Sequence, residues 1–334
     1  MKIINRLLAT VFFLLLFIFS ACGAPTTQKY EKEKFLFGTY IKMIIYSESE
    51  KKAELAFENA FKEIERVDNL YNSKNVNSII YNLNSQKSDI KKVNLDKEGV
   101  EIFKKVNEVH NISKGRFDIT IGPLMEVWGF ADEMNPGKIP NSKELEKAKN
   151  SVGYERVTLT EDEIILNSPT RSLDTGSFLK GYAIEKGKEK LIESGIKHGF
   201  ISAVSSICTI GKKPDGTNWK IGIQNPNSSN EILGIVELDG ESVGVSGDYQ
   251  TFVEIDGKKY HHILDKETGY PVRDKKMVVV IGKNGAQEDL LSTALFLMKE
   301  DEIKKFIAEN KELKIFIVRA DMSTYMSENF TLLK

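Results

Sequence analysis

The chain is poor in the residues that build disulfides and metal clusters, with two cysteines and four histidines among 334 residues. So few thiols exclude a zinc cluster, and an acylated Cys22 would leave Cys208 without a disulfide partner. Charge of one sign is also lacking, because 47 basic and 48 acidic residues leave a net charge of −1. This balance argues against a nucleic-acid surface, so no nucleic-acid partner is expected.

Several sequence patterns are missing as well. The chain has no G-x-S-x-G nucleophile elbow, no Walker A loop and no G-x-G-x-x-G fingerprint. It also has no internal repeat, no low-complexity tract and no Pro/Ser-rich linker. These absences argue against the α/β-hydrolase, P-loop and dinucleotide-binding classes, and they favour one compact unit.

Long apolar runs are confined to the N-terminus. Lys2 and Arg6 precede an apolar run over residues 7–19, and small residues lead to Cys22. This pattern predicts a signal peptide over residues 1–21, because the run is short for a membrane span. The segment resembles a bacterial lipobox, with Phe19 in place of the usual Leu, and the alternative is a secretory signal with an incidental Cys. We expect a lipid anchor at Cys22 on the outer face of the cytoplasmic membrane, followed by a polar tether over 22–34.

The rest of the chain mixes helical and strand periodicity. A strand pair broken at Gly38 is expected over 35–46, and 74–88 is expected to be mostly loop. Apolar spacing predicts helices over 51–70, 96–113, 288–298 and 301–310, with a loop over 174–194 that turns into a helix. Strands are expected within 157–167, 200–223, 232–245, 276–282 and 313–319. The fold class is therefore α+β, a largely antiparallel sheet with packed helices, in one domain over 35–334.

A β-hairpin is predicted around Asp256-Gly257, with strands F-V-E-I and K-Y-H-H-I-L. Strand alternation points His261 and His262 to opposite faces, so one can face a cleft. The turn at Gly269 and Pro271 follows directly, and a His beside a rigid turn suits a proton acceptor. The alternative is a half-exposed hairpin with two surface histidines.

Two further stretches could bind ligands. Asp289 and Thr293 lie four residues apart on one helix face, and their oxygens suit Mg²⁺. The alternative is an acid that complements the helix dipole beside a solvated Thr. The stretch S-L-D-T-G-S-F-L-K-G-Y-A is a loop that enters a helix, with Lys180 positioned for phosphate. The alternative there is a plain helix start capped by Asp174.

Together these motifs resemble the ApbE family of FAD:protein FMN transferases over about residues 35–330. F-D-I-T-I-G-P-L-M-E-V-W-G-F is similar to the family's F-D-P-T-V-G-P-L-x-x-L-W-G-F. L-D-T-G-S-F-L-K-G-Y-A resembles D-L-G-G-I-A-K-G-Y-A, and D-L-L-S-T-A-L resembles A-D-A-L-S-T-A-L. S-G-D-Y…H-I-L-D-K-E-T-G-Y-P-V resembles S-G-D-Y…H-I-I-D-P-R-T-G-Y-P. The combination is more specific than any one motif.

The resemblance implies a T-fold-related architecture that takes FAD as substrate and Mg²⁺ as cofactor. It implies that Asp289 and Thr293 hold Mg²⁺ with the backbone oxygen of Ser177, and that His262 is the proton acceptor. The positions that it implies for FAD binding are Phe37, Arg116, Phe117, Asp118, Asp174, Lys180 and Ile263, with Leu264 beside them.

The implied reaction moves FMN from FAD to a threonine hydroxyl of a partner protein and releases AMP. The resemblance also implies an acceptor that is a membrane flavoprotein subunit of the Rnf or Nqr kind. Two alternatives remain open: an FAD pyrophosphatase that yields FMN and AMP, and a flavin-binding lipoprotein without turnover.

The chain departs from the family pattern at Phe37, where the family has Met, at Ser177, where it has Gly, and throughout one further segment. Where the family has I-N-A-G-G-D-I, this chain has I-S-A-V-S-S-I. Ser202 replaces Asn, Val204 and Ser205 replace the paired glycines, and Ser206 replaces the acid. Because glycine lets phosphate approach the backbone closely, we expect weaker FAD binding or slower turnover than the family pattern would give.

Overall fold

A single large antiparallel sheet organises the molecule. The computed structural model describes residues 27–131, 137–168 and 171–334, and in them the sheet has strand order β1-β2-β6-β7-β10-β13-β14-β15. Its strands are β1 (Gln28–Leu36), β2 (Thr39–Ser47), β6 (Gly199–Ala203), β7 (Ser206–Ile210), β10 (Ser242–Gly247), β13 (Lys275–Gly282), β14 (Lys314–Arg319) and β15 (Thr324–Met326). The predicted α+β class is confirmed.

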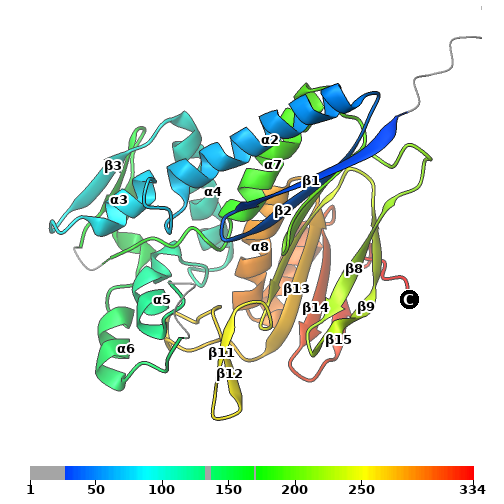
Figure 1. Cartoon of the computed structure of the whole chain (residues 1–334). Coiled ribbons are helices and arrows are strands. Elements are labelled where there is room, and N and C mark those ends of the chain that lie inside the picture. Colours follow the sequence, from blue (N-terminus) through cyan, green and yellow to red (C-terminus); the bar gives the residue numbers. More distant parts are fainter. Residues whose placement is uncertain (1–26, 132–136, 169–170) are drawn as a thin grey trace, which may run out of the picture.

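Helices cover one face of this sheet (Figure 1). They are α2 (Glu50–Tyr71), α7 (Leu179–Glu193) and α8 (Gly285–Leu297), with α4 (Lys97–Ile112) and α9 (Glu300–Glu309) beside them. The stripe Ala53, Ala60 and Ile64 of α2 is fully buried, as helical spacing predicts. Since each such aliphatic side chain contributes about 1.5–3 kcal/mol on burial, this layer forms the main core.

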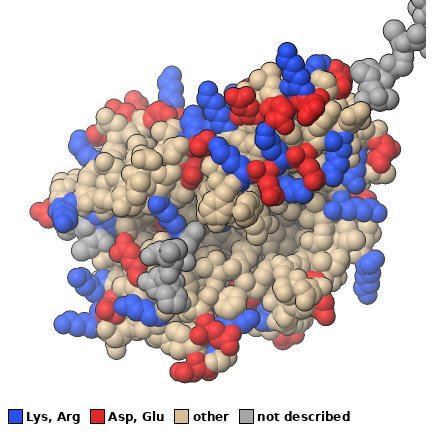
Figure 2. Space-filling model, viewed as in Figure 1, with Lys and Arg blue, Asp and Glu red and all other residues tan. Residues whose placement is uncertain are grey.

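The opposite face carries a second, smaller core. The hairpin of β8 (Trp219–Asn225) and β9 (Ser228–Leu238) packs over it (Figure 1). Val279 and Phe316 of the sheet meet Trp219 and Leu238 of the hairpin there. Figure 2 shows a hollow lined mainly by uncharged residues near the middle of the view.

A smaller lobe is inserted between β2 and β6. It holds β3 (Lys91–Asn94), β4 (Val157–Leu159) and β5 (Glu163–Leu166) in one antiparallel sheet, with α3 (Ile79–Ser85), α5 (Gly122–Trp128) and α6 (Ser142–Lys149). Helix α3 was not expected, and it begins at Ser78, whose hydroxyl accepts from Tyr81 N. Asn141 caps α6, and its side chain forms a capping box with Glu144.

The predicted hairpin is present but shorter than expected. It consists of β11 (Phe252–Ile255) and β12 (Lys258–His261), joined at Asp256-Gly257, both at positive φ. The second strand was expected to continue to Leu264, yet it ends at His261. There the chain turns, and Leu264 instead bridges Pro271.

The N-terminal tether is also shorter than the prediction. Residues 28–34, expected as part of the tether over 22–34, belong to β1 and pair with β2 along its whole length. The strands join at Phe37-Gly38, both at positive φ, so the predicted strand pair with a break at Gly38 is confirmed. The predicted signal peptide and Cys22 lie outside the described residues. Among the described residues no helix is long and apolar enough to cross a membrane.

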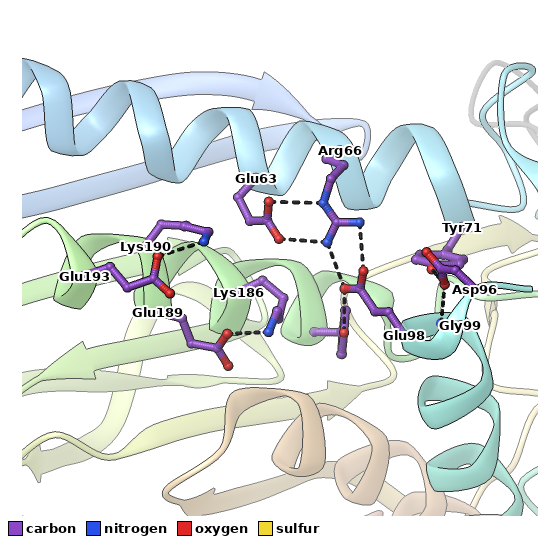
Figure 3. A network of polar contacts seen from close by, with 11 residues as sticks. Glu63, Arg66, Tyr71, Asp96, Glu98, Gly99, Lys186, Glu189, Lys190 and Glu193 are labelled. Atoms are coloured by element: carbon purple, nitrogen blue, oxygen red, sulfur yellow. Dashed lines mark hydrogen bonds and ion pairs between the residues drawn. The ribbon is translucent and has the colours of Figure 1, made fainter.

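A cluster of ionic contacts joins α2, α4 and α7, and we call it the Arg66 cluster (Figure 3). Arg66 contacts Glu63 at 2.7 Å and Glu98 at 2.8 Å, and Tyr182 of α7 donates to Glu98 at 2.7 Å. Hydrogen bonds from Arg66 to Glu63 and Glu98 raise its pKa further above its usual range. The cluster therefore ties three helices together with matched charges.

Candidate active site

The candidate site centres on Asp289, in the first half of α8. Its side chain is buried, and its two oxygens accept from Gly181 N at 2.8 Å and from Ser206 Oγ at 2.8 Å. A Cβ on Gly181 would lie 2.3 Å from Asp289 Cβ, so only glycine allows α7 and α8 to meet this closely. The G in L-K-G-Y-A thus sets the position of the carboxylate.

The electrostatics of Asp289 leave its charge incompletely compensated. Burial raises its pKa, while the charge of Lys180, the Gly181 N–H and the Ser206 hydroxyl lower it. Among the described residues no basic side chain lies within ion-pair distance of this carboxylate. A buried carboxylate of this kind favours an added cation.

Thr293 and Ser177 supply the next oxygens. Thr293 Oγ1 donates to the carbonyl oxygen of Ser177 at 3.3 Å and lies 3.0 Å from Ser246 Oγ. Ser246 Oγ also lies 2.9 Å from Ser292 Oγ. The fold therefore brings together Thr293 and Ser177, which are far apart in the sequence, one turn of α8 beyond Asp289.

This donor set is compatible with Mg²⁺. It offers one carboxylate, one hydroxyl and one carbonyl oxygen, all hard ligands. No group of three or more His, Cys, Asp or Glu side chains that could hold a metal occurs in the part of the chain that the structure describes. A cation bound at Asp289 would therefore keep open positions for phosphate oxygens or water.

The loop before α7 is tightly held. Thr175 is fully buried, and it exchanges hydrogen bonds with Ser73: Ser73 N donates to Thr175 Oγ1 at 2.9 Å, and Thr175 N donates to Ser73 Oγ at 3.2 Å. Asp174 Oδ1 accepts from Gly176 N at 2.6 Å, which forms a local turn and not a helix cap. Phe178 stands at the N-cap position of α7. These hydrogen bonds fix the loop that carries Ser177 and therefore the position of its carbonyl oxygen.

His262 follows directly after β12 and is partly buried. Its Nδ1 lies 3.1 Å from the carbonyl oxygen of Thr251, which can only accept, so Nδ1 carries the proton and Nε2 is left as an acceptor. Burial lowers the pKa of His262 to about 4; the Thr251 contact opposes this, and the charges of Lys180 and Lys74 add to it. The ring is therefore a neutral base at neutral pH. The charge of Lys180 lowers the pKa of both His262 and Asp289.

His261 turns the other way, as strand alternation predicts. It is buried, with Nε2 2.6 Å from the carbonyl oxygen of Val272 and its ring edge-on to Phe296 at 5.7 Å. Burial lowers its pKa to about 4. These contacts hold the turn after β12 against the core, so the role of His261 is structural.

The other predicted FAD contacts are held by partners within the fold. Asp118 accepts from Lys266 Nζ at 2.9 Å and from Tyr154 N at 3.1 Å, and its side chain has no exposed surface. Phe117 and Ile263 are buried in the core, and Arg116 is paired with Glu302 at 2.8 Å. The FAD contacts of Asp118, Phe117 and Ile263 stay predictions. Phe37, at the β1–β2 turn, is partly buried.

Ser206, Ser246 and the Ser73–Thr175 pair were not assigned roles from the sequence. Ser246 stands in the quoted S-G-D-Y motif, which was the available signal. Ser206 was named only as a departure from the family pattern. Its hydrogen bond with Asp289 could not be predicted, because residue spacing does not show which side chains meet between distant elements. Val204, at the turn before it, is 69% exposed and has φ 62°, which is rare for a β-branched residue.

Comparisons with known proteins match one family and its members. The model of the ApbE family matches residues 37–317. A Vibrio cholerae protein named FAD:protein FMN transferase is 28% identical over 69% of this chain and 70% of its own length. A Haemophilus influenzae protein of the same name is 27% identical over 69% of this chain and 68% of its own. The crystal structure of the ApbE protein from Thermotoga maritima superposes with a TM-score of 0.81, at 27% identity, covering 91% of this chain and 98% of that one.

Proposed function

The chain belongs to the ApbE family, and from that premise we propose that it is a Mg²⁺-dependent FAD:protein FMN transferase. The acceptor is a threonine hydroxyl of a partner protein, and AMP is the second product. The observation that carries the proposal is the buried Asp289 carboxylate, whose direct partners are an amide and a hydroxyl, one turn of α8 before Thr293 and its contact with the Ser177 carbonyl oxygen. The names of the curated relatives give it further support.

The proposed reaction is a single displacement at phosphorus. The threonine Oγ attacks the phosphorus of the FMN half of FAD, and the bond from that phosphorus to the bridging oxygen of AMP breaks. The hydroxyl proton passes to His262 Nε2, which the Thr251 carbonyl keeps in the accepting tautomer. The products are a phosphoester of FMN with threonine, and AMP.

The other residues would position the pyrophosphate of FAD and compensate its negative charge. Asp289, Thr293 and the Ser177 carbonyl would hold Mg²⁺, which supplies charge neutralisation at the pyrophosphate when bound. Lys180 precedes Gly181, whose N–H contacts Asp289, and its charge acts on both Asp289 and His262, so we propose that it faces the same phosphates. Since no side chain need form a covalent bond with the substrate, positioning and electrostatics supply most of the rate.

One assay tests the proposal. The protein is incubated with FAD and Mg²⁺, with and without an acceptor flavoprotein of the Rnf or Nqr kind, and AMP is measured. AMP released only with acceptor supports the transferase. AMP released without acceptor identifies an FAD pyrophosphatase, and FAD bound without AMP identifies a flavin-binding protein. The exposed Val204, in place of a family glycine, is the observation that keeps this last alternative in view.

We also propose that Cys22 is lipidated and holds the domain at the outer face of the cytoplasmic membrane, next to a membrane-bound acceptor. The sequence around Cys22 supports this, and a lipid is needed because a lone polar domain has weak membrane affinity. Cys22→Ala should leave a folded domain that leaves the membrane fraction after a salt wash. Continued fractionation of the variant with membranes would contradict the anchor.

A further inference from the structure

A buried carboxylate that the proposed reaction does not use lies beside the start of α8. It belongs to Glu185 of α7, one turn of that helix beyond Gly181. Its Oε2 accepts a hydrogen bond from Gly285 N, in the first turn of α8, at 2.8 Å. The same oxygen accepts from Cys208 Sγ and from Ser242 Oγ, each at 3.4 Å. We call Glu185 and these three donors the Glu185 hub.

The Glu185 hub joins the four elements that carry the candidate site. Each member of the hub lies two or four residues from a residue of the site, on the same element. Side chains two or four apart in a strand, and four apart in a helix, lie on one face, so hub and site share a face of every element. The pairs are Glu185 with Gly181 on α7, Gly285 with Asp289 on α8, Cys208 with Ser206 on β7, and Ser242 with Ser246 on β10.

The two helices meet at glycines, so little room is left for adjustment between them. A Cβ on Gly181 would lie 2.5 Å from the carbonyl oxygen of Gly285, and a Cβ on Gly285 would lie 2.6 Å from Cys208 Sγ. The helices also exchange two hydrogen bonds of 2.8 Å. Gly181 N donates to Asp289, and Gly285 N donates to Glu185. The second bond therefore holds α8 one turn before the carboxylate of the site.

The charge of Glu185 is compensated within α7. Lys188 Nζ lies 3.0 Å from Glu185 Oε1, and the two side chains are only 10% and 11% exposed. Asp289 differs, because its direct partners are an amide and a hydroxyl. Since Glu185 has a cationic partner of its own, the hub is suited to hold neighbouring elements and not to bind an ion from outside.

We propose that Glu185 is a positioning residue that fixes the Mg²⁺-binding oxygens of α8 against α7, β7 and β10. The inference rests on the proposed Mg²⁺-dependent function. Without the hub contact the start of α8 can shift, and Asp289 and Thr293 of the same helix shift with it. Loss of a group that holds metal ligands in place commonly lowers metal affinity about 10- to 100-fold. Because Glu185 acts through the backbone of α8, the lower end of that range is expected.

The test compares two double variants that both remove the buried ion pair. Glu185→Gln/Lys188→Met keeps a side-chain oxygen that can accept from Gly285 N, and Glu185→Leu/Lys188→Met has no acceptor. Mg²⁺ binding to each full-length protein, without FAD, is measured by isothermal titration calorimetry. The Kd for Mg²⁺ should stay at the wild-type value in the Gln variant and rise about 10-fold in the Leu variant.

Stability measurements separate positioning from a general loss of packing. The matched control is Ser327→Ala, which removes a buried hydroxyl that accepts from Ile315 N at 2.9 Å, at the β15 end of the sheet. It should lower the urea unfolding midpoint and leave the Kd for Mg²⁺ unchanged. A milder variant, Cys208→Ala/Ser242→Ala, keeps the contact between α7 and α8 and releases β7 and β10. It should raise the Kd for Mg²⁺ about 3-fold, and this result stands even if the Leu variant does not fold.

Other outcomes overturn the proposal in distinguishable ways. Equal Mg²⁺ affinity in the folded Gln and Leu double variants, or an unchanged Kd in Cys208→Ala/Ser242→Ala, would refute positioning by Glu185 and leave the proposed function intact. An equal loss in both double variants would assign the effect to the ion pair, and an equal loss in Ser327→Ala would assign it to overall stability; either result would refute the proposal. If the wild type binds no Mg²⁺ and still releases AMP from FAD, the Mg²⁺ dependence itself is wrong, and positioning fails with it.

Discussion

The Arg66 cluster and the candidate site each include a residue of α7, and these two residues are adjacent in the sequence. Charges are paired in the cluster, whereas the buried carboxylate of the site has no charged partner in direct contact among the described residues. Tyr182 belongs to the cluster, and Gly181 donates to Asp289 of the site. In the cluster, two carboxylates surround one guanidinium, and their hydrogen bonds raise the pKa of Arg66. In the site, burial raises the pKa of Asp289, whose direct partners are an amide and a hydroxyl. Matched charge holds helices together, whereas unmatched buried charge is suited to bind a cation from outside.

The largest effect should come from Asp289→Ala. The variant removes the only carboxylate of the oxygen set, so FAD turnover should fall by about 10³-fold or more, several kcal/mol of lost transition-state stabilisation. Excess Mg²⁺ should restore part of it, because Thr293 and Ser177 remain. Without metal, the variant should be at least as stable as the wild type, since an uncompensated buried charge is lost. A large loss of stability in metal-free urea unfolding would contradict the statement that Asp289 is an uncompensated buried charge.

His262→Ala should be next in size. Its loss should cost about 10²–10⁴ in turnover, the usual range for a general base, while FAD and Mg²⁺ still bind. Because the pKa of His262 is about 4, wild-type kcat/KM should fall only below about pH 4 to 5 and stay flat to neutrality. An acid limb near pH 6.5 would show an unperturbed imidazole and contradict the site geometry.

His261→Ala is the companion variant, and it should lower stability more than turnover. Both imidazoles have a pKa of about 4 in the folded protein against about 6.5 when unfolded. Between these values the unfolded chain binds more protons, so the free energy of unfolding falls as pH is lowered from 6.5 to 4. Urea unfolding at several pH values should show a shallower fall for His261→Ala than for the wild type.

Arg66→Ala should change stability and leave turnover alone. It leaves Glu63 and Glu98 without their partner, which should cost about 1–2 kcal/mol after allowance for solvent exposure. Urea unfolding measures the cost, and FAD turnover per folded molecule should stay at the wild-type value. The control is Lys190→Ala, which removes the exposed Lys190–Glu193 pair and should have no measurable effect. A loss of turnover in Arg66→Ala would mean that the cluster positions Gly181.

The smallest effect should come from Val204→Gly/Ser205→Gly. Relief of the positive φ at Val204 should add up to about 1 kcal/mol of stability, reduced by the greater freedom of glycine in the unfolded chain. FAD binding or AMP release should increase if this turn approaches the dinucleotide. Isothermal titration with FAD and an AMP assay test this, and no change in either would place the turn away from FAD.

Patterns within one element proved predictable, and contacts between elements did not. The spacing of Asp289 and Thr293 and the turn at Asp256-Gly257 are local, so the sequence predicted both. Strand alternation correctly separated His261 from His262, although β12 ends one residue before His262. By contrast, Ser206 reaches Asp289 only through sheet pairing. Most of strand β1, residues 28–34, was missed because its polar residues show no apolar alternation, and it is a strand through its backbone pairing with β2.

Strand β1 affects how copies of the protein associate with one another. It is the outermost strand of the large sheet, and one row of its backbone N–H and C=O groups has no neighbouring strand in that sheet. Such an edge can recruit a strand from another copy and start aggregation. The residues Glu31, Lys32, Glu33 and Lys34 are exposed along it, and their hydration would be lost on such pairing. This charged border should keep the protein soluble when many copies share a small area.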